Sequence, residues 1–136
     1  MLKQFIEQLS IDMGFEQALE ANEDGSYSLR LEPDINVILK EGENQSVLLY
    51  AKVAELPTHN TEEFLVKLMT ANLLGRETGG AALGLDNEGK RVVLLDFLVE
   101  ENNYRRFYER LEDFVNYVEA WSHETIEFSE KQHAEE

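Results

Sequence analysis

Hydrophobic residues at the start of the chain recur at spacings of three and four, which places them on one face of an α-helix. They are Leu2, Phe5, Ile6, Leu9 and Met13. The same period returns in residues 61–74, and again from about residue 101 to Trp121. The pattern therefore predicts three helices, one near each end of the chain and one in the middle.

Between these helices the hydrophobic pattern changes to that of β-strands. Apolar and polar residues largely alternate in 27–31 and 35–39, as in strands with one buried face. Residues 47–53 are more continuously apolar, as in a strand buried on both faces. Residues 82–85 predict a short strand and residues 91–99 a long apolar strand. The order is helix, three strands, helix, two strands, helix. Because strands and helices cluster and the turns are short, we expect an α+β domain with a twisted antiparallel sheet packed with helices.

The middle predicted helix carries apolar residues on more than one side. Phe64, Leu65, Leu68, Met69 and Leu73 do not fit one narrow stripe. A surface helix of a globular protein normally shows a single apolar stripe, so this wider distribution indicates burial on two sides. The helix lies either deep in the monomer or between two copies of the chain, and the pattern leaves both open.

The length of 136 residues fits one domain with a single core. We expect that domain over residues 1–128, followed by an acidic, flexible tail over residues 129–136. The start of the chain lacks the long apolar run of a signal peptide or membrane span. The chain has no cysteine, which argues against a disulfide framework and a thiolate metal site and fits a reducing cytoplasm.

The formal net charge of -16 is the most unusual compositional feature. A surface this acidic repels the phosphates of nucleic acids and anionic lipids, so we expect neither nucleic-acid binding nor membrane binding. The same charge attracts a basic partner, or it serves solubility alone. Composition leaves both interpretations open.

Two short motifs suggest ligand chemistry but lack its requirements. The segment GRETGGAALG, residues 75–84, is as glycine-rich as a phosphate-binding loop. It follows a helix and precedes a strand, and no Lys-Ser or Lys-Thr pair comes after it, so it does not fit that loop. The segment DNEG, residues 86–89, lacks the distal glutamate of a calcium loop and is typical of a hairpin turn.

The histidines and serines form no recognisable catalytic or metal-binding pattern. His59, His123 and His133 lie near segment ends or in the tail, and His123-Glu124 has no second histidine at the spacing of a zinc protease. We therefore expect no catalytic residue, no metal and no cofactor, and interpret the chain as a binding module. The alternative, an enzyme or small-ligand protein, would use carboxylates that converge in space and the aromatic residues Tyr104, Tyr108 and Trp121.

Four stretches together match the pattern of a known family. They are the amphipathic start through residue 15, residues 24–57, residues 68–98, and the aromatic last helix up to Trp121. The segment ANLLGRETGGAALGLD, residues 71–86, is fairly specific in this position. On these stretches the chain resembles the class I type III secretion chaperones, the Tir-chaperone (CesT-like) family.

The resemblance implies a function without catalysis. Chaperones of this family are homodimers in the bacterial cytoplasm, and they bind a segment near the N-terminus of one or a few secreted effectors. They keep that segment soluble and extended and promote its delivery to the secretion apparatus, through the secretion ATPase. The resemblance leaves one alternative open, a regulatory protein of the same fold that sequesters a partner.

The resemblance also implies two sets of contact residues. For the dimer interface these are Phe64, Leu65, Leu68, Met69, Leu73, Val92 and Leu94. For the effector segment, which in this family also adds a strand at a sheet edge, they are Phe5, Leu9, Leu29, Leu31, Ile35, Val37 and Leu39. Hydrophobic periodicity shows that side chains are buried but not against what, so packing inside one protomer stays open for both sets.

Overall fold

The computed structural model describes residues 2–31, 34–75, 77–99 and 103–134, and it has the predicted α+β order. Helix α1 (Leu2–Asp12) precedes strands β1 (Tyr27–Leu31), β2 (Ile35–Glu41) and β3 (Val47–Glu55). Helix α2 (Thr61–Asn72), strands β4 (Ala82–Leu85) and β5 (Arg91–Leu98), and helix α3 (Tyr104–Ala134) follow. Short 3-10 turns, Glu43–Gln45 and Leu73–Gly75, lie before β3 and after α2.

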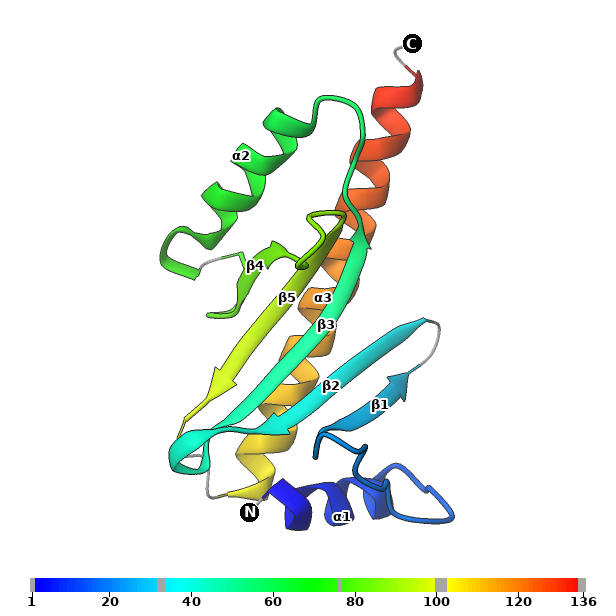
Figure 1. Cartoon of the computed structure of the whole chain (residues 1–136), viewed down its shortest axis with the longest axis vertical. Coiled ribbons are helices and arrows are strands. Elements are labelled where there is room, and N and C mark those ends of the chain that lie inside the picture. Colours follow the sequence, from blue (N-terminus) through cyan, green and yellow to red (C-terminus); the bar gives the residue numbers. More distant parts are fainter. Residues whose placement is uncertain (1, 32–33, 76, 100–102, 135–136) are drawn as a thin grey trace.

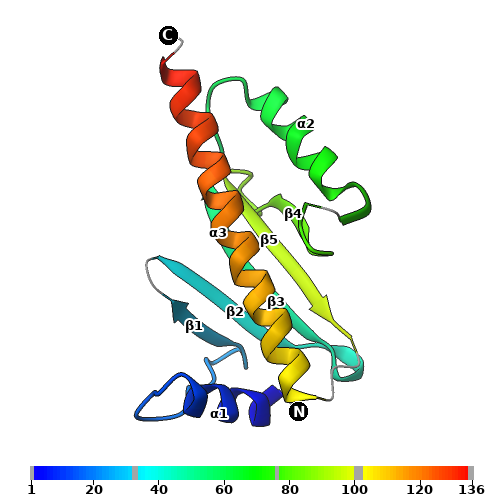
Figure 2. The ribbon, with the colours of Figure 1, turned by 180° about the vertical axis from the view of Figure 1, so that it is seen from behind.

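The five strands form one antiparallel sheet in the order β1-β2-β3-β5-β4. Short turns make β1, β2 and β3 consecutive neighbours, and the β4–β5 hairpin joins the sheet through β5. Helix α3 runs behind the sheet in Figure 1 and crosses its near face in Figure 2, where the view is reversed. The predicted antiparallel α+β architecture is confirmed.

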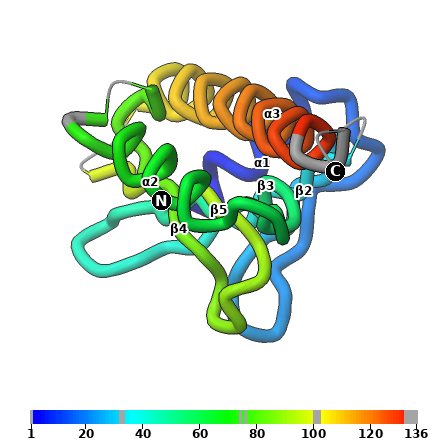
Figure 3. The backbone as a smooth tube through the Cα atoms, turned by 90° about the horizontal axis from the view of Figure 1, so that it is seen from above, coloured from blue at the N-terminus to red at the C-terminus, as the bar shows by residue number. Residues whose placement is uncertain are grey.

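The hydrophobic core lies between α3 and the sheet face that it covers. Along β3, Val47, Leu49 and Ala51 are fully buried on that face. The alternate residues Leu48 and Tyr50 point to the opposite face and are only half-buried. The expectation that residues 47–53 are buried on both faces is therefore wrong for this protomer, because α3 covers the other face of the sheet and none of the described helices lies on this one (Figure 3).

Helices α1 and α2 pack at opposite ends of α3, as seen from behind in Figure 2. At one end, the ring of Phe5 stacks on Phe107 with centroids 4.9 Å apart. At the other end, the rings of Phe64 and Phe128 lie 5.0 Å apart.

Helix α3 continues beyond the aromatic stretch that predicts it. Contact with α2 extends its buried face to Thr125 and Phe128, so the helix runs on to Ala134, within the predicted tail. The predicted domain boundary at residue 128 stays a prediction. The predicted helix start near residue 101 lies outside the described residues, and α3 begins at Tyr104.

Candidate partner-binding surfaces

Helix α2 exposes a second apolar face. Phe64, Leu68 and Ala71 are buried against the rest of the protomer. Val66 and Met69 of α2, with Leu73 directly after its last residue, follow the spacing i, i+3, i+7 on the other side, and their exposed fractions are 63%, 73% and 68%. We call these three residues the α2 outer row. Exposed apolar side chains in a row are typical of a surface that a partner covers.

The predicted dimer residues divide between the core and this outer row. Met69 and Leu73 are exposed, and Leu65 is half-buried. Four others, Phe64, Leu68, Val92 and Leu94, are buried within the protomer. Sequence reasoning missed Val66, whose place in the row follows from the same helical period. It also missed Val99, an exposed apolar residue directly after β5.

The predicted effector residues lie mostly inside the protomer. Leu31 is half-buried, and the buried residues of this set are Phe5, Leu9, Leu29, Ile35, Val37 and Leu39. These buried side chains pack in the protomer core. Other side chains of the same part of the chain reach the solvent. Ile11 of α1 is 70% exposed, and Phe15 lies exposed just after the helix. Contact with an effector stays a prediction for the whole set.

A shallow pocket of about 670 Å³ opens beside α1. Its walls are one side of α1 and the connector that leads to β1, including Lys3, Ile6, Glu7, Leu19 and Tyr27. The connector is held to the helix by Ser10, whose hydroxyl accepts a hydrogen bond from the backbone N–H of Leu19 at 3.1 Å. The pocket lies beside the edge strand β1, whose Tyr27 is part of its wall.

The two edges of the sheet differ in what covers them. At the β4 edge, the side-chain amide of Asn72 hydrogen-bonds both backbone groups of Leu83. Helix α2 therefore occupies part of that edge. Strand β1 forms the other edge, on the side of α1. An unpaired strand edge offers backbone donors and acceptors to another chain irrespective of its sequence.

The glycine-rich segment packs against α3. The indole N–H of Trp121 donates a hydrogen bond to the backbone carbonyl of Glu77 at 2.9 Å. The buried hydroxyl of Thr78 donates to the carbonyl of Ala81 at 2.5 Å. The Trp121 contact holds the loop between α2 and β4 on the helix, and the backbone of Gly79 lies so close to the ring of Tyr117 that an added Cβ would not fit.

The DNEG segment is the predicted hairpin turn. Asp86 accepts hydrogen bonds from the backbone N–H groups of Lys90 and Arg91 at 2.9 and 3.2 Å, and it pairs with the Arg91 guanidinium at 3.2 Å. The hydrogen bond from Lys90 is the largest cause that lowers the pKa of this carboxyl below its ordinary value. Asp86 thus closes the turn between β4 and β5.

Within the described residues, no group of three or more histidine and acidic side chains is placed to hold a metal ion. His59 follows β3 and His123 lies on α3, while the side chain of His133 lies outside the described part. The same part of the chain contains no helix with the length and apolarity needed to span a bilayer. The surfaces that the structure offers are thus apolar rows, a pocket and strand edges, which suit contacts with polypeptides.

Comparison with known proteins identifies the family. The chain matches the Tir chaperone protein (CesT) family over residues 4–122. It belongs to this family. The resemblance noted in the sequence is confirmed, and with it the general function of a chaperone that binds type III secretion effectors.

Individual relatives agree with this membership. A Chlamydia pneumoniae protein, CPj0713/CpB0740, is 34% identical over 122 residues, which cover 89% of this chain and 93% of that protein. The structure resembles a chain of the ExsC-ExsE complex, with a TM-score of 0.76 and 19% identity over 91% of this chain and 92% of the other. It also resembles a chain of the Yersinia pestis type III secretion chaperone SycH in complex with a fragment of YscM2, with a TM-score of 0.67 and 16% identity over 87% and 97%. At 19% and 16% identity, the two solved structures show that the fold is shared.

Proposed function

We propose that two copies of this chain form a homodimer that binds a segment near the N-terminus of one or more type III secretion effectors. The dimer keeps the segment soluble and extended in the bacterial cytoplasm and promotes its delivery to the secretion apparatus, through the secretion ATPase. It acts by binding alone, without catalysis. The observation that carries this proposal is the α2 outer row, three apolar side chains that remain exposed along α2 and at its C-terminal end, while the opposite face of the helix is buried.

The dimer would bury the outer row against its copy on the second protomer. In a two-fold dimer the same surface of both chains meets, so an apolar row can cover itself. Leaving Met69 and Leu73 in water costs the hydrophobic free energy that pairing would recover. The predicted interface residues that are buried in each protomer, such as Phe64 and Leu68, would support the row from beneath.

The effector segment would bind at the α1 end of the molecule. Ile11 and Phe15 are exposed there, and the pocket beside α1 lies next to the edge strand β1. An extended segment could add to that edge through backbone hydrogen bonds and place alternate side chains in the pocket. One of the similar solved structures is described as the HopA1-SchA chaperone–effector complex, which is consistent with this use of the fold.

The test is capture of the partner from the native bacterium. A tagged chain is purified, co-purifying proteins are identified by mass spectrometry, and the bound region is mapped by limited proteolysis. We expect one or a few secreted proteins, each protected over a segment near its N-terminus and cleaved elsewhere. Capture of a regulator that is not secreted would favour the alternative of a partner-sequestering protein. Purification without any protein partner would contradict the proposal.

A further inference from the structure

Strands β2 and β3 separate at one end of the sheet. Their pairing ends where Val37 lies opposite Ala51. Beyond that point β2 pairs with β1, through Ile35 and Asn36, while β3 runs on to Glu55 and pairs with β5. Figure 1 shows the two strands diverging there. The last residues of β3 are therefore not paired with β2, and the edge of β3 on that side faces the gap.

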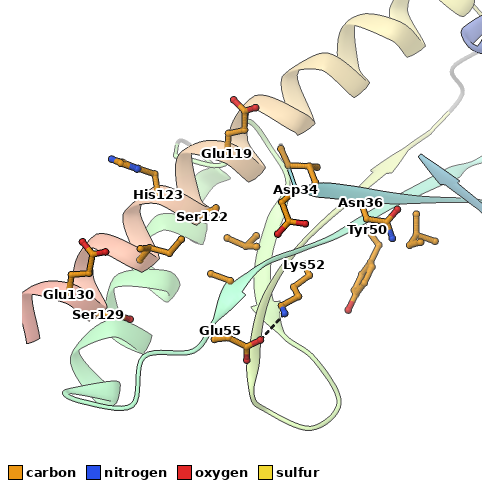
Figure 4. Close-up of a pocket in the computed structure, with 15 residues that line it drawn as sticks. Asp34, Asn36, Tyr50, Lys52, Glu55, Glu119, Ser122, His123, Ser129 and Glu130 are labelled. Carbon is orange, nitrogen blue, oxygen red and sulfur yellow. Dashed lines mark hydrogen bonds and ion pairs between the residues drawn. The ribbon is translucent and has the colours of Figure 1, made fainter. Parts of the chain in front are cut away.

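A groove of about 920 Å³ fills this gap and continues to the C-terminal half of α3 (Figure 4). Its apolar part includes Ile35 and Val53, which are nearly buried. Ile126 of α3 also lines the groove, with 49% of its surface exposed. Tyr50 and Ile38, both half-buried, belong to the same lining on the strand side. The groove thus combines an apolar lining with a strand edge.

The charged residues around the groove are mainly acidic. Four carboxylates line it, from both the strands and α3: Asp34, Glu55, Glu119 and Glu130. The lysine of the lining, Lys52, forms an ion pair with Glu55 at 2.7 Å and lowers the pKa of that carboxyl. The other basic side chain in the lining is His123. A partner with positive charge beside its apolar residues is complementary to this lining.

We propose that this groove binds a second stretch of the effector, an extended segment in which apolar residues alternate with lysine or arginine. Backbone groups of the segment would pair with the β3 edge at residues 52–55, and its apolar side chains would face Val53 and Ile126. Its cations would face Glu119 and Glu130. The proposal rests on the proposed function, because it takes the partner to be an effector polypeptide.

The groove is distinct from the α2 outer row and from the surface at α1, although Ile35, one of the predicted effector residues, is part of its lining. The α2 outer row lies on a helix that packs at the β4 edge, whereas the groove lies between β2 and β3. The effector surface proposed at α1, with the exposed Ile11 and Phe15, lies at the other end of α3. A segment held at α1 and a segment held in the groove could therefore be bound at once by one protomer. When one of the two segments is bound, the other is held close to its site at a high effective concentration, which raises the overall affinity for the partner.

A peptide titration tests the groove without any effector. The probes are two short fluorescently labelled peptides, one alternating valine with lysine and the other valine with glutamate, and binding to the full chain is followed by anisotropy. We expect the lysine peptide to bind and the glutamate peptide not to bind. The double variant Glu119→Lys with Glu130→Lys should weaken the lysine peptide about tenfold, since each reversed carboxylate turns attraction into repulsion.

A matched variant controls for overall charge. Glu112→Lys with Asp113→Lys makes the same change of net charge on exposed positions of α3 outside the groove lining. We expect it to bind the lysine peptide nearly as well as the unmodified chain. Equal weakening by both double variants would mean that the peptide senses only net charge, and it would overturn the proposal.

Backbone amide signals locate the peptide independently of these variants. In a nitrogen–proton correlation spectrum, the lysine peptide should shift the amides of residues 52–55 and slow their hydrogen exchange. Shifts confined to α1 and β1 would overturn the groove as the site.

The same variants separate this proposal from the proposed function. If the unmodified chain captures an effector and Glu119→Lys with Glu130→Lys captures it with unchanged affinity, the groove proposal fails and the chaperone function stands. If the lysine peptide binds in the groove but no effector is captured, the effector function fails, and the groove loses the partner assigned to it.

Discussion

The side-chain amide of Asn72, the last residue of α2, forms a closed pair of hydrogen bonds with the backbone of Leu83 in β4. Its Nδ2 donates to the carbonyl oxygen of Leu83 at 2.8 Å, and its Oδ1 accepts from the Leu83 N–H at 2.7 Å. Strand β4 is the last strand of the sheet and pairs with β5 on its other side, so the hydrogen-bonded pair lies on the outer edge of β4. One helix residue thus substitutes for a neighbouring strand.

Replacing Asn72 with alanine should loosen the β4 edge. Both backbone groups of Leu83 would lose their partner, which we expect to cost about 1–3 kcal/mol of unfolding free energy. Urea denaturation measures that cost, and hydrogen exchange should show faster exchange of the Leu83 amide. The control is Asn116→Ala, at an exposed position of α3. Both variants replace a helical asparagine with alanine, so both raise helix propensity by the same amount. Equal stability of both variants would contradict a structural role for the pair.

A charge at Met69 should abolish dimer formation while the protomer stays folded. Met69 is 73% exposed in the α2 outer row, so Met69→Glu costs the isolated protomer little. In a two-fold dimer, both copies would carry the new carboxylate into the apolar interface. We expect the mass measured by light scattering to fall to that of one chain, with an unchanged helical circular dichroism signal.

The matched control for that variant is Thr70→Glu. Thr70 is the next residue of α2 and is exposed on the helix side that carries Glu63 and Lys67. It receives the same charge outside the outer row, and we expect it to remain a dimer. If Met69→Glu remains dimeric while it is fully folded, the outer row is not the interface.

For helix α2, the sequence predicted two buried surfaces but not which residues belong to each. Its apolar residues on two sides predict two buried surfaces, and the structure separates them into a face in the core and the exposed outer row. The period places Leu68 and Met69 on different sides of the helix, but it could not show which side faces the core, because both sides are apolar. The order of elements was predictable since period and turn residues are local properties.

The effector surface was less predictable than the fold. Alternation in β1 and β2 identifies Leu29 and Val37 as buried, and both pack in the core of the protomer. The groove between β2 and β3 depends on where the pairing of two strands ends and on the distant helix α3. No local pattern encodes either relation, so the groove could not be predicted from the sequence.

Two aspartate substitutions should separate core from partner surface. Val37 has no exposed surface, and Val37→Asp should cost about 4 kcal/mol or more because it buries a charge in an apolar core. Ile11 is 70% exposed, so Ile11→Asp should leave the urea midpoint nearly unchanged. If α1 holds the effector, Ile11→Asp should weaken effector capture. Full capture by a folded Ile11→Asp variant would remove this residue from the effector surface.

The Asp86 turn predicts a dependence of stability on acid. The hydrogen bond from the Lys90 N–H lowers the pKa of Asp86 in the folded chain below its ordinary value of 3.8. A lowered folded pKa means that the carboxylate stabilises the fold above its unfolded pKa, and that this contribution is lost as the pH falls through the folded pKa. Asp86→Asn should therefore be less stable than the unmodified chain at neutral pH, with a difference that shrinks below pH 3.8.

Urea midpoints across this pH range check the prediction. Asp113→Asn, at an exposed position of α3, makes the same chemical change away from the turn and serves as the reference. A difference between Asp86→Asn and the unmodified chain that stays constant with pH would show that the turn depends on side-chain shape and not on charge.

The close contact between Gly79 and α3 can be tested with a pair of alanine variants. Gly79 has a φ of +65°, and a Cβ added there would lie 2.4 Å from the ring of Tyr117, so alanine forces the ring or the loop to move. Gly89 has a similar φ of +69° with open space around the added atom.

Both alanine variants carry the cost of a left-handed backbone, roughly 1–2 kcal/mol. Gly79→Ala should lose about 1–3 kcal/mol more from overpacking, measured as the difference in unfolding free energy. Equal losses would show that Tyr117 turns away without cost, and that the loop is held on α3 by the Trp121 hydrogen bond to Glu77 and not by this contact.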